Sequence, residues 1–204
     1  MPFIPSPRTV VAAAGLSAVV LGSTGTGLSG ASTRAASAAA KPPQIVTATR
    51  VRRSQGTLAS GTPVASAVVA GQRVFTDAKH GFALASVSDA DYPVATTDGG
   101  KTWRTNGPAL HLHAAQAPLA LVFVGAVNRM TLFAWGGGQV IDTTRDGGKT
   151  WYRALFSNGS PIAVVQNLNG HLLGFVGSFS GASTWQYLSK DGGRTWHYQA
   201  TVGR

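Results

Sequence analysis

The chain has 204 residues, of which 44% are hydrophobic, and a formal net charge of +10. This length suits one sizeable domain, and the absence of cysteine excludes a disulfide framework, a thiolate metal site and lipoprotein attachment. All seven acidic residues are Asp, because the sequence contains no Glu, and 17 Lys and Arg outnumber them. The charge is typical of a basic extracellular domain. The alternative is attraction to polyanions such as cell-wall polymers, acidic glycans or nucleic acid.

Residues 1–38 have the features of a secretory signal peptide. Arg8 gives a positively charged start, Val10 to Gly22 form an apolar stretch, and Ala36-Ser37-Ala38 fits a small-residue cleavage site. The apolar stretch has 13 residues, too few to span a bilayer comfortably. We therefore expect a secreted or cell-envelope protein without a stable membrane span after cleavage, with an uncleaved anchor as the alternative.

Residues 39–63 are predicted to form a linker and an N-terminal strand. Lys41-Pro42-Pro43 is typical of a linker, Gln44 to Val51 alternates weakly as a strand does, and Ser54 to Pro63 is rich in Gly, Ser and Thr. The segment therefore contributes one strand at most before the regular part of the chain begins.

A local basic cluster, Arg50, Arg52 and Arg53, lies at the end of that strand. On a strand Arg50 and Arg52 share a face, and Arg53 points to the other face. The aromatic residues are dispersed and do not accompany this cluster, so we do not expect specific nucleic-acid binding.

Residues 64–204 are predicted to form repeated units of about four short strands per ~45 residues, after strand candidates at Val64–Ala70 and Arg73–Thr76. No stretch outside the signal segment has the 3.6-residue periodicity of a helix. The main predicted strands are Gly81–Ser86, Tyr92–Thr96, Leu119–Val124, Met130–Trp135, Val140–Thr144, Ile162–Val165, Leu172–Val176 and Thr184–Leu188.

One eight-residue pattern occurs three times, at residues 96–103, 144–151 and 189–196. It has the form [Ser/Thr]-x-Asp-Gly-Gly-[Lys/Arg]-Thr-Trp, and its Asp residues are 48 and then 45 positions apart. A fixed period of this size is the signature of a repeat architecture. The residues that define it are Asp98, Gly100, Trp103, Asp146, Gly148, Trp151, Asp191, Gly193 and Trp196.

The repeated pattern is turn chemistry placed between two strands. Glycine adopts positive φ without a Cβ clash, and Asp accepts hydrogen bonds from backbone a few residues on. The Ser or Thr two residues before Asp adds a second local bond. The Trp begins the return strand, where we expect its ring to fill the space between neighbouring units.

The pattern resembles the Asp-box (BNR) repeat, whose members place the box on the turn between the third and fourth strands of β-propeller blades. The Gly-Gly-Lys-Thr-Trp form, with Phe75-Thr76-Asp77 and Gly81-Phe82-Ala83 upstream, is most similar to the Ycf48-like group. The resemblance covers residues 64–204. It implies an all-β, propeller-like domain in which the box is structural and usually remote from the ligand face.

The number of boxes leaves the closure of the propeller open, because three blades are fewer than the usual minimum of four. Gln44–Val51 and Val64–Ala70 are candidates for a degenerate fourth blade that lost its box. A second explanation is that the chain is a fragment of a longer protein. A third is an open set of blades that self-associates through its sheet edges. Alternatively, the Gln44–Val51 strand completes the last blade.

Catalysis by carboxylates is poorly supported by the sequence. The sialidases that share the Asp box use an Arg cluster, a Tyr nucleophile, a supporting Glu and an Asp, and this chain has no Glu. Other glycosidases need two carboxyl groups at a set separation, and the Asp residues outside the boxes are Asp77, Asp89, Asp91 and Asp142. Asp89 and Asp91 are close in sequence, but Ser88 to Pro93 is predicted to be a solvated turn.

His111 and His113 share a face of any strand and offer two ligands for a metal, without an evident third. Each box offers one carboxylate, whereas calcium takes six to eight oxygen ligands. We therefore expect no catalytic residue, no metal and no cofactor.

The function predicted from the sequence is that of a secreted, non-enzymatic repeat protein that binds a protein or glycan partner through its blade-end loops. A scaffolding or assembly role is what the Ycf48-like resemblance implies. The alternative is a sialidase-like glycoside hydrolase, truncated or degenerate.

Overall fold

The structure, a computed structural model, describes residues 41–203 apart from residues 113–120, 137 and 168. The described chain is all-β, as predicted, with one short 3₁₀ turn at Ser66–Val68 and no α-helix in these ranges. Correspondingly, no helix in the described part of the chain is long and apolar enough to cross a membrane. The predicted signal peptide lies outside the described residues.

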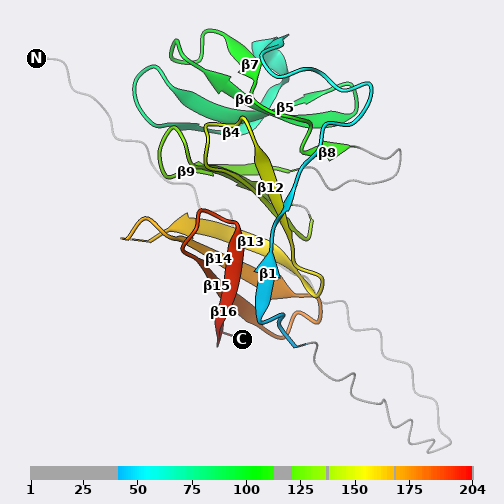
Figure 1. Cartoon of the computed structure of the whole chain (residues 1–204), viewed down its shortest axis with the longest axis vertical. Helices are drawn as coiled ribbons and strands as arrows, with labels where there is room; N and C mark the ends of the chain where they lie inside the picture. Colours follow the sequence, from blue (N-terminus) through cyan, green and yellow to red (C-terminus); the bar gives the residue numbers. More distant parts are fainter. Residues whose placement is uncertain (1–40, 113–120, 137, 168, 204) are drawn as a thin grey trace, which may run out of the picture. The chain divides into compact units, whose positions relative to one another are not determined.

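Each of the three repeat units forms an antiparallel sheet of four consecutive strands, which we call a blade (Figure 1). Blade 1 consists of β4 (Val69–Phe75), β5 (Gly81–Val87), β6 (Ala90–Thr96) and β7 (Trp103–Thr105). Blade 2 consists of β9 (Phe123–Ala126), β10 (Leu132–Trp135), β11 (Val140–Thr144) and β12 (Trp151–Leu155). Blade 3 consists of β13 (Gly159–Gln166), β14 (Leu172–Ser178), β15 (Thr184–Ser189) and β16 (Thr195–Val202).

Every box lies on the hairpin between the third and fourth strands of its blade, as the resemblance implies. The register is the same each time, because the box Ser or Thr ends the third strand and the box Trp begins the fourth or follows its first residue. The further strand β8 (His111–Leu112) pairs with the start of β6.

The N-terminal segment adds a fifth strand to all three blades, whereas the sequence suggested such a strand for the last blade alone. Strand β1 (Ile45–Thr47) pairs with β16, β2 (Thr49–Arg50) with β12, and β3 (Pro63–Val64) with β7. In Figure 1 this segment runs from blade 3 past blade 2 to blade 1. It thus visits the blades in the reverse of their order in the sequence, each time beside the box strand.

The predicted single strand Gln44–Val51 is therefore two strands in two different sheets. The hypothesis of a fourth blade built from Gln44–Val51 and Val64–Ala70 is wrong, because these residues join the three box blades. The alternative that Gln44–Val51 completes the last blade is confirmed for Ile45–Thr47, which pair with β16, but not for Thr49–Arg50, which pair with β12. The described blades form an open, partial propeller, with blade 1 packed on blade 2 and blade 2 on blade 3 (Figure 1).

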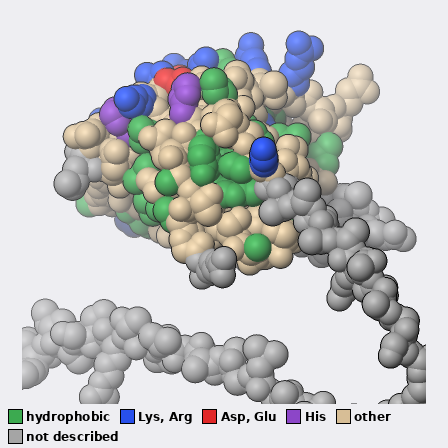
Figure 2. All heavy atoms as spheres, turned by 90° about the horizontal axis from the view of Figure 1, so that it is seen from below, with side chains coloured by type: hydrophobic (Ala, Val, Ile, Leu, Met, Phe, Trp, Pro, Cys, Tyr) green, Lys and Arg blue, Asp and Glu red, His purple; other side chains and the backbone are tan. Residues whose placement is uncertain are grey.

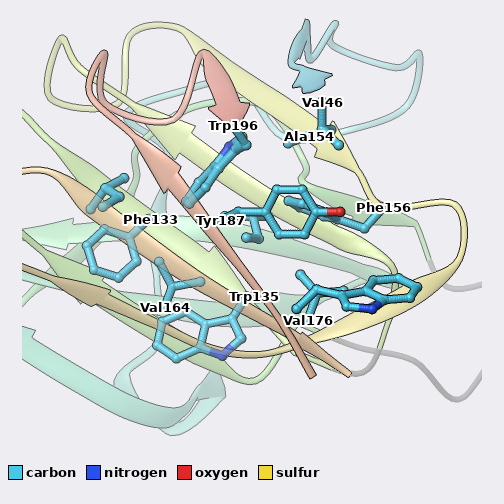
Figure 3. Close-up of a cluster of buried hydrophobic side chains, with 12 residues drawn as sticks. Val46, Phe133, Trp135, Ala154, Phe156, Val164, Val176, Tyr187 and Trp196 are labelled. Atoms are coloured by element: carbon cyan, nitrogen blue, oxygen red, sulfur yellow. The ribbon is translucent and has the colours of Figure 1, made fainter. Parts of the chain in front are cut away.

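The hydrophobic core lies between successive blades and consists largely of aromatic rings. Between blades 2 and 3, Trp196 and Tyr187 from blade 3 meet Phe156 and Phe133 from blade 2 (Figure 3). Between blades 1 and 2, Trp151 stacks on Phe82. Burial of these large side chains holds the blades together, because neighbouring blades share few hydrogen bonds.

The outer face of blade 1 is covered by the N-terminal segment. Leu58, Val64 and Val68 pack against the buried cluster that contains Trp103. The hydroxyl of Tyr92 accepts a hydrogen bond of 3.0 Å from the backbone of Leu58. This segment thus closes the end of the stack that has no preceding box blade.

Candidate functional site

The first box is a closed set of local hydrogen bonds around Asp98. Its Oδ1 accepts from the Thr96 hydroxyl at 2.7 Å and from the Thr102 backbone N–H at 2.9 Å, and its Oδ2 accepts from the Thr102 hydroxyl at 2.6 Å. The backbone N–H of Gly100 donates to the Thr96 hydroxyl oxygen at 2.9 Å. The side chains therefore satisfy the backbone donors of a tight turn, as expected from the sequence.

The second and third boxes repeat this geometry. Asp146 accepts from the Thr150 N–H at 2.8 Å, and Asp191 accepts from the Thr195 N–H at 2.9 Å. The hydroxyls of Thr144 and Ser189 each lie 2.8 Å from the Oδ1 atom of the Asp in their own box. Each carboxylate is thus engaged within its own hairpin.

Both glycines of every box have positive φ. In blades 2 and 3 the second glycine also lies against the preceding blade. A Cβ at Gly148 would lie 2.3 Å from Asn106 of blade 1, and a Cβ at Gly193 would lie 2.3 Å from Thr143 of blade 2. The box is therefore both a turn and a contact surface between blades.

The box tryptophans are buried and face the preceding blade where there is one. Trp103, Trp151 and Trp196 are each at most 1% exposed. The indole N–H of Trp151 donates to the backbone oxygen of Asn106 in blade 1 at 2.9 Å, whereas those of Trp103 and Trp196 donate within their own boxes. Trp151 and Trp196 fill the space between units as predicted, whereas Trp103 packs within blade 1 and against the N-terminal segment.

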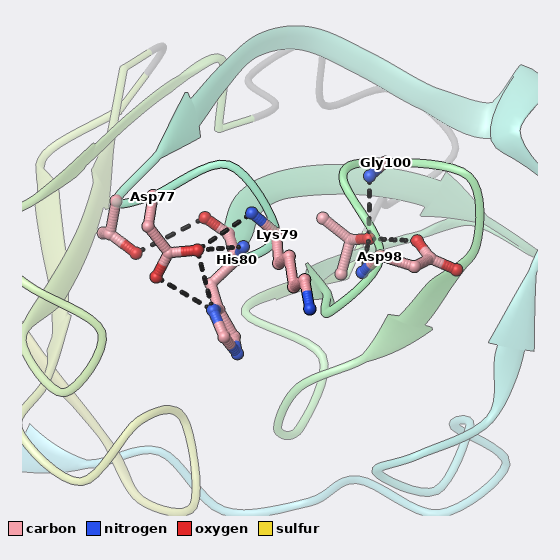
Figure 4. A network of polar contacts seen from close by, with 7 residues as sticks. Asp77, Lys79, His80, Asp98 and Gly100 are labelled. Atoms are coloured by element: carbon pink, nitrogen blue, oxygen red, sulfur yellow. Dashed lines mark hydrogen bonds and ion pairs between the residues drawn. The ribbon is translucent and has the colours of Figure 1, made fainter.

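A second turn motif, which the sequence did not identify as repeated, lies between the first and second strands of each blade. The Asp77 Oδ1 accepts from the backbone N–H groups of Lys79 and His80, both at 2.9 Å (Figure 4). Asn128 and Asn167 do the same in blades 2 and 3. The sequence signal for this turn is an Asp or Asn four or five residues before the second strand of each blade. It was missed because blade 1 has Asp at this position and blades 2 and 3 have Asn.

The carboxylates of these turns have lowered pKa values. Hydrogen bonds from the Thr102 hydroxyl, the Thr102 backbone and the Thr96 hydroxyl hold the pKa of Asp98 well below its ordinary value. Backbone hydrogen bonds from Lys79 and His80 lower the pKa of Asp77 to about 2. Partial burial acts to raise the pKa values of Asp146 and Asp191, but their hydrogen bonds outweigh it and the pKa values are lowered.

These shifts predict an acid-labile fold. A carboxylate whose pKa is lower in the folded than in the unfolded chain contributes stability above the unfolded value of 3.8, and that contribution is lost as the pH falls toward the folded value. We expect the melting temperature to fall progressively below about pH 4. Asp98→Asn should be less stable near neutrality and should lose less on acidification than Asp89→Asn, whose carboxylate is exposed on the β5–β6 turn. Parallel melting profiles of the two variants between about pH 6 and pH 2 would contradict this.

A basic cavity of about 480 Å³ lies where the N-terminal segment passes blades 1 and 2. Arg50, Arg52, Arg53 and Lys149 are four of its lining residues, and none of the described residues that line it is acidic. Gly107, Pro108 and the second box, through Thr150 and Trp151, complete much of the wall. We call this cavity the basic cleft.

The basic cleft forms because the strand ends at Arg50. The Arg50 backbone pairs with Tyr152, and the Val51 N–H donates to the Trp151 oxygen at 2.9 Å. From Val51 to Thr62 the chain forms no strand, and Arg53 lines the same cavity as Arg50 and Arg52. The expectation that Arg53 points to the opposite face is therefore wrong.

A second cavity of about 450 Å³ adjoins the basic cleft, because Arg50, Val51 and Arg52 line both. Its wall also includes His111 and Arg153. Arg153 forms an ion pair with Asp142 of β11, in which Nε donates to Oδ1 at 2.8 Å and Nη2 donates to Oδ2 at 2.7 Å. Its Nη2 also donates to the Leu110 backbone oxygen.

The Asp142–Arg153 ion pair is buried at its carboxylate and partly exposed at its guanidinium. Asp142 is fully buried, and the Arg153 side chain is 32% exposed. Burial raises the pKa of Asp142, against the opposing effect of the hydrogen bonds and charge of Arg153. Burial also acts to lower the pKa of Arg153, but the Asp142 carboxylate outweighs it and the pKa is raised.

The Asp box is also what comparison with known proteins finds. A family model described as "BNR/Asp-box repeat" matches residues 187–198, which contain the third box. The boxes at residues 96–103 and 144–151 share with the matched one the hydrogen bond from the Thr N–H to the Asp Oδ1. The chain thus contains one segment that matches the Asp-box repeat model and two further segments with the same sequence pattern.

Solved structures with similarity to this Asp-box chain include two of Ycf48. One is described as "YCF48 bound to D1 peptide", with 20% sequence identity, a TM-score of 0.44, and coverage of 81% of this chain and 48% of that one. The other is Ycf48 from Cyanidioschyzon merolae, with 16% identity, a TM-score of 0.34, and coverage of 78% and 61%. The chain thus spans about half to three fifths of the length of these proteins. No curated protein matches it.

The structure does not pair the two candidate carboxylates that are close in sequence, Asp89 and Asp91. Asp89 lies exposed on the β5–β6 turn with φ of 60°, whereas Asp91 lies on β6 and is 1% exposed. Asp91 accepts from the Ser86 hydroxyl at 2.5 Å and lies 3.3 Å from His111 Nδ1. The predicted solvated turn at Ser88–Pro93 is therefore wrong beyond Asp89, because Ala90 to Thr96 form a buried strand.

The histidine pair is only partly described. His111 contacts Asp91, and His113 lies outside the described residues. Among the described residues no group of three His, Cys, Asp or Glu side chains is placed to hold a metal ion. Asp98, Asp146 and Asp191 each stay in their own box and line neither the basic cleft nor the cavity beside it.

Proposed function

We propose that this Asp-box protein is a non-enzymatic scaffold whose basic cleft binds an acidic segment of a partner protein. The observation that supports it is the gathering of Arg50, Arg52, Arg53 and Lys149 around one cavity without an acidic residue among its described lining. Arg guanidinium groups bind carboxylates through paired hydrogen bonds, and Lys adds a point charge.

The shape and rigidity of the cleft support the same proposal. Its floor includes Gly107 and the buried Trp151, whose positions are fixed by packing between blades 1 and 2. A preformed site loses less conformational entropy when an extended peptide binds. One of the similar solved structures is described as Ycf48 bound to a D1 peptide. Secretion, predicted from residues 1–38, belongs to the proposal as well.

Binding of an acidic peptide tests the proposal directly. The probe is a fluorescently labelled peptide rich in Glu, compared by anisotropy with the same peptide carrying Gln in place of Glu. We expect the full chain to prefer the Glu peptide and to lose that preference as salt rises, because exposed charges are screened. Equal affinity for the two peptides would refute the proposal.

A matched pair of variants locates the site on the chain. Lys149→Ala removes a cleft residue, and Lys101→Ala removes the equivalent exposed Lys of the first box, which does not line the cleft. We expect Lys149→Ala to weaken binding of the Glu peptide by about two- to fivefold and Lys101→Ala to leave it unchanged. Arg50→Ala with Arg52→Ala should weaken it by about tenfold or more.

A further inference from the structure

The outer face of blade 3 is an apolar sheet surface on which no other described strand packs. The main contacts of blade 3 within the described chain run from β13 to β10 and β11, and its added strand β1 contacts β12. They are made on the side of the sheet that contains Trp196. Seen from below in Figure 2, hydrophobic side chains gather across the middle of the surface, and Lys and Arg side chains lie mainly toward its rim. Strands β13–β16 contain no Asp, Lys or Arg at all.

Strand pairing identifies the residues of this face. Leu173 is opposite both Val165 and Leu188, and Leu188 is in turn opposite His197, which pairs with Ile45. Residues directly opposite in antiparallel strands share a face, so these side chains form one row across all five strands. Ile45 is 58% exposed and Val165 is 45% exposed. We call the row, together with Phe175, the outer face of blade 3.

The same positions in the other blades receive the next blade. By register with the box, Leu173 corresponds to Phe82 in blade 1 and Phe133 in blade 2. Phe82 is covered by Trp151, and Phe133 lies in the cluster that contains Trp196. Blade 3 therefore keeps an apolar receiving surface at the place where its predecessors pack against a following sheet.

We propose that this face binds the same face of a second copy of the chain. A head-to-tail contact would need the Trp103 face of blade 1, which Leu58, Val64 and Val68 already cover. The contact left to two identical chains is isologous, one outer face on the other. The uncharged strands allow two molecules with a net charge of +10 to meet there without opposing Lys or Arg side chains.

The size of the face sets the expected strength of the dimer. Five strands about 4.8 Å apart, with about seven residues of about 3.3 Å each, cover roughly 24 by 23 Å. Two copies would bury about 1,000 Å² in total, which is near the lower limit for a specific interface. A dissociation constant in the range of about 1–100 µM is therefore expected.

Sedimentation velocity of the full chain over about 1–200 µM tests this directly. We expect a monomer–dimer equilibrium that Val165→Lys weakens by at least about tenfold, because the substitution places two like charges in an apolar contact. The matched control is Leu155→Lys, which adds the same charge at a residue of blade 2 that is 55% exposed. It should dimerise like the unsubstituted chain, and circular dichroism should show both variants folded.

Two results would overturn the proposal. A dimer that Val165→Lys and Leu155→Lys affect equally would place the contact elsewhere. A chain that stays monomeric at about 200 µM would leave residues 1–40 or a different protein as the occupant of the face. Neither result bears on the basic cleft, which lies between blades 1 and 2.

Discussion

Replacing Trp151 with alanine is expected to lower the free energy of unfolding by about 3–5 kcal/mol. The indole is fully buried and stacks on Phe82 with ring centroids 5.8 Å apart. It also gives its N–H to Asn106, whose carbonyl oxygen would lose that partner. The ring lies between blades 1 and 2, so its removal leaves a cavity where two sheets are held together mainly by apolar contact.

The control for Trp151→Ala is Lys149→Ala, two residues earlier on the same hairpin. Lys149 is exposed, and loss of an exposed charge changes stability by well under about 1 kcal/mol. Thermal and urea unfolding of both variants measures the difference. Equal melting temperatures would mean that the box Trp does not hold the blades together. If Trp151→Ala does not fold, Trp151→Phe should fold with an intermediate loss of stability.

Replacing Arg153 with alanine is expected to cost about 3 kcal/mol of stability, because it leaves the Asp142 carboxylate buried without its partner. Asp142 is fully buried, and both of its oxygens accept from Arg153. Without Arg153, only burial remains as the main influence on the carboxyl, and the pKa of Asp142 should rise further. Arg104→Ala, at an exposed residue of blade 1, is the control and should change stability by about 0.5 kcal/mol or less.

The chain itself offers a replacement for the ion pair. In blade 1 the positions equivalent to Asp142 and Arg153 are Val94 and Thr105, which pair in the same register. The double variant Asp142→Val with Arg153→Thr should therefore be more stable than Arg153→Ala, since no buried charge remains unpaired. Urea unfolding of the two single variants and the double variant measures this difference. The explanation is wrong if the double variant loses as much stability as Asp142→Val and Arg153→Thr lose together.

The box geometry could be predicted from the sequence because its hydrogen bonds are local. Every bond that defines the first box joins residues between Thr96 and Thr102. Eight residues of suitable chemistry are enough to close such a turn, whatever surrounds it. The strand order within each blade followed for the same reason, because neighbouring strands are joined by short connections.

The parts of the candidate site that were missed depend on contacts between distant residues. Arg53 enters the basic cleft only because β2 stops at Arg50, where the segment leaves β12 for blade 1. Asp142 looked like a free carboxylate in the sequence, and its partner lies on the opposite strand of the hairpin, 11 residues away. No periodicity in the segment itself indicates where such a strand ends or which side chain faces it.

Turn chemistry and strand alternation act over a few residues, so the amino-acid pattern was enough to predict an all-β chain with three box-bearing units. Three further features depend on contacts between distant parts of the chain: residues 45–64 run across all three sheets in reverse order, Lys149 lines one cavity with three arginines, and no other described strand packs on the outer face of blade 3. Those outcomes depend on which sheets pack together. That packing is set by the burial of large side chains between blades, such as Trp151 and Trp196. The free energy of this burial depends on residues far apart in the sequence, so no local pattern encodes it.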